Sequence, residues 1–232
     1  MNTFECALCG VKQTLPESAE AFAEAKRLFN TIIEQQTIAI FGQGRQSMSL
    51  EALSKPGKGK MVGVLHYRNK EGEGFLYGFS GQFDDDFKLF GFVPALIDYE
   101  VMGAHKRATE RMLDQLGEAI EVTKSADTRK DLKHKRKRLS QALMQDIFAL
   151  YRPMTGLGFK LRIEKAWSAK SGIPAATGDC CAPKLLQEAN RLGYQVLGVA
   201  EIFVGSARQQ SDQVHGHFAT PCAAKCQPLL GA

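Results

Sequence analysis

The sequence has no long hydrophobic run. No segment of its 232 residues approaches the roughly 20 consecutive apolar residues that a membrane-spanning helix needs. The first ten residues, MNTFECALCG, contain neither the cationic start nor the apolar stretch of a secretory signal. With 44% hydrophobic residues, 8 prolines and 6 cysteines, the composition excludes a disordered chain, a collagen-like repeat and a disulfide scaffold. We therefore expect a globular protein that is soluble and cytoplasmic, with no membrane association.

Excess charge is scarce outside one segment. The chain has 30 Lys and Arg against 25 Asp and Glu, a net charge of +5. Residues 124–138 hold eight basic side chains against two aspartates, and subtracting this local +6 leaves the rest at −1. Such a cluster can displace counterions from phosphates, which predicts a polyanionic partner. A solvated helix face is the alternative. The expected contact residues are Lys130, Lys133, Lys135, Arg136, Lys137 and Arg138.

The cysteines fall into two groups. Cys6 and Cys9 lie near the start, whereas the other four, at 180, 181, 222 and 226, lie near the end together with His215 and His217. Thiols in a reducing compartment are metal ligands or small buried residues rather than disulfides. Because zinc prefers thiolate and imidazole ligands in tetrahedral sets, we expect a zinc site. Its predicted ligands are Cys180, Cys222 and Cys226, with His215 or His217 as the fourth; buried free thiols with a structural histidine pair are the alternative.

Hydrophobic periodicity predicts the elements of the first two thirds. Residues 17–36 have the spacing of an amphipathic helix, and 61–69 with 74–82 read as two strands of a hairpin. Apolar stripes over 103–123 and 128–150 predict two long helices joined by a short turn, with the cations near the tip of this helical hairpin.

The last third predicts a mixed unit. We expect a strand at 158–167, a helix that ends at Gly193, a buried strand that ends at Gly205, and a short helix that Pro221 opens and that carries Cys222 and Cys226. The fold class is then α+β, with a small antiparallel sheet, packed helices and a projecting helical hairpin. We divide the chain into residues 1–100, the basic hairpin 101–152, and a zinc-binding part at 153–232 that completes the core.

The order of strand hairpin, cysteine helix, strand and cysteine helix is similar to the cytidine deaminase superfamily. In that family a Cys or His followed two residues later by Glu is joined by P-C-x-x-C; zinc activates water and the Glu carries protons. Here the positions two after Cys180 and Cys181 are Ala182 and Pro183, and PCAAKC has three intervening residues. A deaminase-like reading therefore leaves Asp179 as the nearest proton carrier.

A second resemblance covers roughly residues 45–231. The segments GKMVGVLHYRNKEGEGFLYGFSGQ, GFVPALIDYE, LKHKRKRLSQALMQDIF, ATGDCCAPKLLQEANRLGYQVLGVAEIFVG and HGHFATPCAAKCQPLLG resemble the N-terminal extension of some bacterial RluA-type pseudouridine synthases. That family modifies uridines in tRNA and ribosomal RNA, so the resemblance implies structured RNA as a partner. The catalytic R-L-D motif of the synthase does not occur here. The chain is then a free-standing extension that works with a synthase domain in trans, or a part of a larger product.

Three classes of function remain. The first is an RNA-binding accessory module of tRNA or rRNA modification, in which zinc has a structural role. The second is a zinc-dependent hydrolase or deaminase-like enzyme with Asp179 as its proton carrier, and the third is a structural dimerisation domain. The number of metal ligands separates the first two, because a closed set of four leaves no position for water.

Overall fold

The computed structural model describes residues 3–6, 8–42, 48–83, 88–156, 158–209 and 211–231, apart from the side chains at 104 and 105. The chain is mixed α+β and divides into two compact units. The first unit comprises residues within 1–96, 153–161 and 165–232, and the second comprises 97–152 with 162–164. No helix in the described part of the chain combines the length and the apolar character that crossing a membrane requires.

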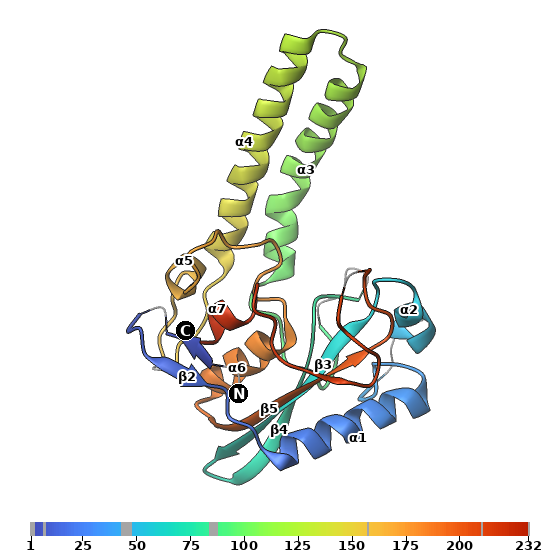
Figure 1. The fold of residues 1–232 in the computed structure, drawn as a ribbon. Helices are drawn as coiled ribbons and strands as arrows, with labels where there is room; N and C mark the ends of the chain where they lie inside the picture. The colour runs from blue at the N-terminus through green and yellow to red at the C-terminus, as the bar shows by residue number, and fades with distance from the viewer. Residues whose placement is uncertain are drawn as a thin grey trace. The chain divides into compact units, whose positions relative to one another are not determined.

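A four-stranded antiparallel sheet forms the centre of the first unit. Its order is β4-β3-β5-β6, so β5 pairs with β3 although more than a hundred residues separate them in the sequence. The bounds are β3 Lys60–Asn69, β4 Gly72–Phe79, β5 Gln195–Val204 and β6 Phe218–Ala219. A second, two-stranded sheet pairs β1 (Thr3–Glu5) with β2 (Lys12–Thr14). Figure 1 shows the long strands β3, β4 and β5 side by side.

Helices cover both faces of the central sheet. Alternate residues of β3 and β5, such as Val62 and Ile202, pack in one apolar cluster with α1 (Ala19–Gln35). The residues between them, such as Leu65 and Val199, pack in a second cluster with α6 (Cys181–Leu192). Because successive residues of a strand point to opposite faces of the sheet, α1 packs on one face and α6 on the other. The short helices α2 (Leu50–Ser54) and α7 (Gln227–Leu230) belong to this unit, whereas α5 (Ile163–Ala166) includes residues of both units.

Two glycines allow α6 to lie close to the sheet. Gly63 of β3 and Gly78 of β4 are cross-strand partners. A Cβ atom at Gly63 would lie 2.8 Å from the Cys181 sulfur, and one at Gly78 would lie 2.9 Å from Leu185. Any larger residue would move the helix away, so this glycine pair determines how near the first turn of α6 comes to the strands.

The second unit is a helical hairpin. Helices α3 (Tyr99–Val122) and α4 (Ala126–Leu150) pack against each other and are joined by three residues. Asp98 caps α3 by accepting from the Glu100 N–H at 2.9 Å, and Ser125 caps α4 by accepting from the Thr128 N–H at 3.3 Å. The two helices predicted from the apolar stripes are confirmed.

Two predicted elements of the last third are wrong. The strand expected at 158–167 is replaced by α5, because Ile163 and Ala166 are buried at a helical spacing while Glu164 and Lys165 between them are exposed. The helix expected at Pro221 begins only at Gln227. The predicted helix ending at Gly193 and the predicted buried strand are confirmed, as α6 and β5.

Candidate metal centre

Three cysteines from two distant segments meet in the first unit. Cys180 is the N-cap residue of α6, and Cys222 and Cys226 lie on the turn before α7. In that turn the Cys226 N–H donates to the Cys222 carbonyl at 3.1 Å, which makes one helical turn and brings the two side chains to the same side. The three sulfur atoms lie within 4.8 Å of one another, so the group could hold a metal ion.

The three thiols share protons unequally. Hydrogen bonds with Cys180 and Cys226 lower the pKa of Cys222, whereas hydrogen bonds with Cys180 and Cys222, together with burial, raise the pKa of Cys226. A hydrogen bond with Cys222, together with burial, raises the pKa of Cys180 to about 12. A metal ion would favour the ionised form of all three thiols.

The donor set and the spacing fit zinc. Thiolate sulfur is a preferred ligand of zinc, with bonds of about 2.3 Å, and a tetrahedral arrangement then separates sulfur atoms by roughly 3.8 Å. Cys222 and Cys226 have their sulfur atoms 3.4 Å apart. Small side-chain adjustments thus suffice to close the group around an ion. Among the described residues, no further His, Cys, Asp or Glu belongs to this group.

The two histidines predicted as alternative fourth ligands lie outside the group. His215 accepts a hydrogen bond from the Gly205 N–H at 2.9 Å through Nδ1, and its ring centroid lies 5.2 Å from that of Phe29. His217 is exposed, and its carbonyl accepts from the Phe203 N–H at 3.0 Å. Cys6 and Cys9 lie in the turn between β1 and β2, apart from the other cysteines in the described structure. This arrangement does not support a histidine ligand, which stays a prediction from the sequence.

The three cysteines line a cavity of about 380 Å³. Its charged lining residues are Lys60, Asp179, Glu201, Arg208 and Lys225. Asp179, the proton carrier considered from the sequence, is half-buried, and its carbonyl accepts from the Gly81 N–H at 2.7 Å. The cavity thus places both acidic and basic groups beside the cysteines.

Sequence reasoning missed Glu201, which lies on β5 on the face that α6 covers. Its side chain is 4% exposed, and its Oε1 accepts from the Ala182 N–H at 3.0 Å. Burial raises the pKa of Glu201 to about 7. Hydrogen bonds with the neighbouring thiols are the main reason that the pKa values of Cys180 and Cys226 are raised, and the charge of Glu201 adds to this effect. One acidic residue in the apolar run QVLGVAEIFVG was the signal that could have identified it.

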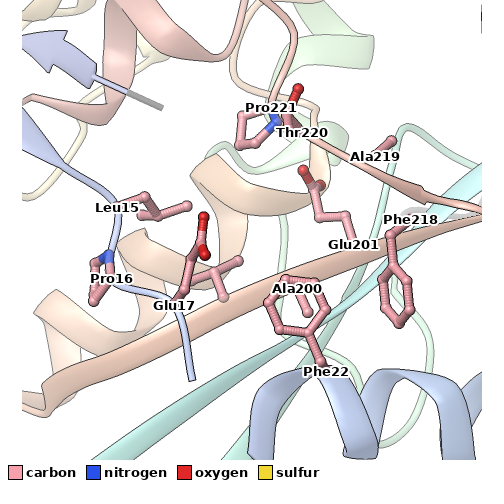
Figure 2. A pocket seen from close by; sticks show the side chains of 11 residues that line it. Leu15, Pro16, Glu17, Phe22, Ala200, Glu201, Phe218, Ala219, Thr220 and Pro221 are labelled. Carbon is pink, nitrogen blue, oxygen red and sulfur yellow. The ribbon is translucent and has the colours of Figure 1, made fainter. Parts of the chain in front are cut away.

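Glu201 also borders a smaller pocket. Figure 2 shows its side chain between the sheet and Thr220, with the rings of Phe22 and Phe218 nearby. This pocket has a volume of about 110 Å³. Glu201 and Thr220 line it as well as the larger cavity, so they form the wall between the two spaces.

Lys184 of α6 has an unusual environment. The residue is 1% exposed, and among the described residues its ammonium has no hydrogen-bond partner. Its Nζ lies 4.0 Å from the ring centroid of Phe79. Burial lowers the pKa of Lys184 to about 8, against the opposing charges of Cys181, Asp179 and Cys180. An unpaired buried ammonium is costly, but zinc with three thiolates carries a net negative charge that would compensate it.

The predicted RNA-contacting residues all lie in the second unit. Lys130, Lys133, Lys135, Arg136, Lys137 and Arg138 are exposed on α4. Arg136 donates to the Leu113 carbonyl at 3.3 Å, and no ion pair occupies any of the six within the described structure. Their positive charges are therefore available to solvent.

Comparisons with family models, with curated proteins and with solved structures found no match to this chain. The resemblances to the pseudouridine synthase extension and to the deaminases stay predictions. The site itself consists of three thiols and a buried carboxylate that line one cavity.

We expect the purified chain to bind one zinc ion per molecule through the cysteine group. Cys222→Ser and Cys180→Ser should each abolish stoichiometric zinc binding, whereas His215→Ala and His217→Ala should retain it. Elemental analysis and a chelator competition titration measure both outcomes. Loss of zinc in a histidine variant, with the cysteine variants unaffected, would contradict the assignment.

We expect Lys184→Met to have opposite effects with and without zinc. Removing the unpaired ammonium should raise the free energy of unfolding of the metal-free protein by about 1–3 kcal/mol, but weaken zinc binding about tenfold. Urea denaturation in a chelator and zinc titrations measure the two effects, with Lys12→Met as an exposed control. A metal-free variant that is less stable than the wild type would show that Lys184 has another role.

Proposed function

We propose that this chain is a zinc-dependent hydrolase of the deaminase type. The observation that carries the proposal is the convergence of Cys180, Cys222, Cys226 and the buried Glu201 on one cavity. Three protein ligands with a fourth position facing a cavity are typical of catalytic zinc sites, whereas structural sites have four protein ligands. Three ligands among the described residues therefore favour an enzyme over the structural zinc first expected from the sequence.

Each residue then has a defined task. A zinc ion held by the three thiolates would activate a water molecule as a nucleophile near neutral pH. Glu201 would take one proton from that water as its oxygen bonds to the amine-bearing carbon of a C=N group, and would deliver it to the leaving amine as the C–N bond breaks. The remaining hydroxyl proton would pass to the neighbouring nitrogen, so that water and the substrate give a carbonyl and ammonia. A pKa of about 7 suits a group that both accepts and donates a proton at neutral pH. Glu201 is 4% exposed, so its carboxylate has little contact with bulk water.

Glu201 also has a structural task, and the two tasks can be separated. Its Oε1 accepts from the Ala182 N–H in the first turn of α6, which satisfies a backbone donor that the helix leaves unpaired. A glutamine at 201 keeps an oxygen acceptor for this bond but cannot carry the proton. An alanine loses both the acceptor and the carboxylate.

Glu201→Gln should reduce turnover by at least a hundredfold with zinc content and melting temperature nearly unchanged. Glu201→Ala should lose turnover and also stability. Ammonia release from aminated bases, nucleosides, nucleotides and RNA, measured by a coupled enzymatic assay with zinc-loaded protein, tests this. Asp179→Asn is the matched control.

The proposal fails if zinc-loaded wild type releases no ammonia from any member of the panel. It also fails if Glu201→Gln is as active as the wild type. If turnover is lost in Asp179→Asn but not in Glu201→Gln, Asp179 is the proton carrier, as the sequence suggested.

A second candidate function is RNA binding as an accessory module of tRNA or rRNA modification, with a synthase domain in trans as the partner. It is favoured by the exposed cations of α4, whose middle part also borders a groove of about 680 Å³ between the two helices of the hairpin. Lys133, Arg136 and Lys137 line this groove. Cations gathered on one helix suit a backbone of phosphates, which positions a nucleic acid without reading its bases.

Changing Lys133, Lys135, Arg136 and Lys137 together to Gln should flatten the salt dependence of RNA binding. The slope of log affinity against log salt should change by roughly 0.7 for each lost contact to a single strand, with sequence preference unchanged. Anisotropy titrations with tRNA and rRNA fragments at three salt concentrations measure it. A control with the same loss of charge, at exposed Lys12, Lys70, Lys165 and Lys170, should keep the wild-type slope; equal slopes for both variants would contradict the assignment.

A further inference from the structure

The cavity that contains the cysteines has a basic side. Lys60 at the start of β3, Arg208 in the loop after β5 and Lys225 in the cysteine turn all line it. Lys225 donates through Nζ to the Ala175 carbonyl at 2.7 Å. The side chains of Lys60 and Arg208 form no hydrogen bond or ion pair in the described part of the chain. These two cations are therefore available to a ligand.

Lys60 is held where water hydrates it poorly. Its Nζ lies 5.3 Å from the ring centroid of Phe83, and a Cβ atom at Gly81 would come within 3.3 Å of it. Burial, together with repulsion from Lys58 and Arg208, lowers the pKa of Lys60. A partly desolvated cation beside a second cation is unfavourable until an anion enters and neutralises both.

We propose that Lys60 and Arg208 bind the phosphate group of a small phosphorylated molecule in this cavity. Arg208 offers the planar set of donors that matches two phosphate oxygens, and Lys60 adds a compact charge. A volume of about 380 Å³ is that of a pocket for a small molecule. Ser206, Ser211 and Gln213 supply further polar groups on the same lining.

The lining of the cavity then combines two kinds of group. The cysteines and Glu201 are the reactive groups, and Lys60 and Arg208 are the groups that recognise charge. The identification of the bound molecule as a substrate rests on the proposed function. The phosphate site itself does not, because it needs neither zinc nor turnover.

Calorimetry with inorganic phosphate tests the site in the full zinc-loaded chain. Lys60→Gln with Arg208→Gln should weaken phosphate binding at least tenfold. Lys12→Gln with Lys170→Gln removes the same charge from exposed positions outside the lining and should leave the affinity within twofold. The Cys222→Ser variant should still bind phosphate, which separates this site from phosphate bound to zinc. If the double variant is unstable, Arg208→Gln alone replaces it, because Arg208 is exposed. This single variant should lose part of the affinity for phosphate.

Two further arms identify the source of the phosphate. A nucleoside 5′-monophosphate should bind with the same dependence on Lys60 and Arg208, and a short single-stranded RNA should not. The proposal would be overturned if the two double variants bound phosphate equally well. It would also be overturned if only the binding of RNA depended on Lys60 and Arg208. Glu201→Gln should lose turnover and keep phosphate binding, so failure of the enzyme and failure of the phosphate site are distinguishable.

Discussion

The close approach of α6 to the central sheet is the constraint on which the candidate site depends. The first turn of the helix carries Cys180, and it can lie against β3 and β4 because Gly63 and Gly78 present no side chains there. The turn that holds Cys222 and Cys226 follows β6, which pairs with β5 at Glu201 and Ile202. Two segments about forty residues apart in the sequence thus place three sulfur atoms within 4.8 Å.

Three thiols and a carboxylate lie close together inside the fold. Burial raises the pKa of Glu201, and hydrogen bonds among the thiols, together with burial, raise the pKa of Cys180 and Cys226. Lys184 provides a positive charge from within α6 with no hydrogen-bond partner of its own among the described residues. A divalent cation held by three thiolates would leave, together with the carboxylate and the buried ammonium, a much smaller negative charge than the ionised groups carry without it.

Periodicity and residue type predicted much of this structure. The apolar spacing of residues 17–36 and the two long stripes of the helical hairpin gave α1, α3 and α4, because packing on one face leaves a clear pattern. The grouping of Cys180, Cys222 and Cys226 followed from their chemistry. Glu201 was missed because a strand pattern does not say which helix terminus an inward side chain will meet. The strand predicted at 158–167 was wrong because so short a segment has too few apolar residues to distinguish the period of a strand from that of a helix.

The number and type of atoms around the metal test the account most directly. X-ray absorption at the zinc edge, on the zinc-loaded chain, distinguishes sulfur from lighter ligands by bond length. We predict three sulfur atoms at about 2.3 Å and one oxygen at about 2.0 Å, the oxygen belonging to water. Three sulfurs with an imidazole nitrogen, or four sulfurs, would make the site closed and contradict a catalytic role, and the absence of bound zinc would contradict the site itself.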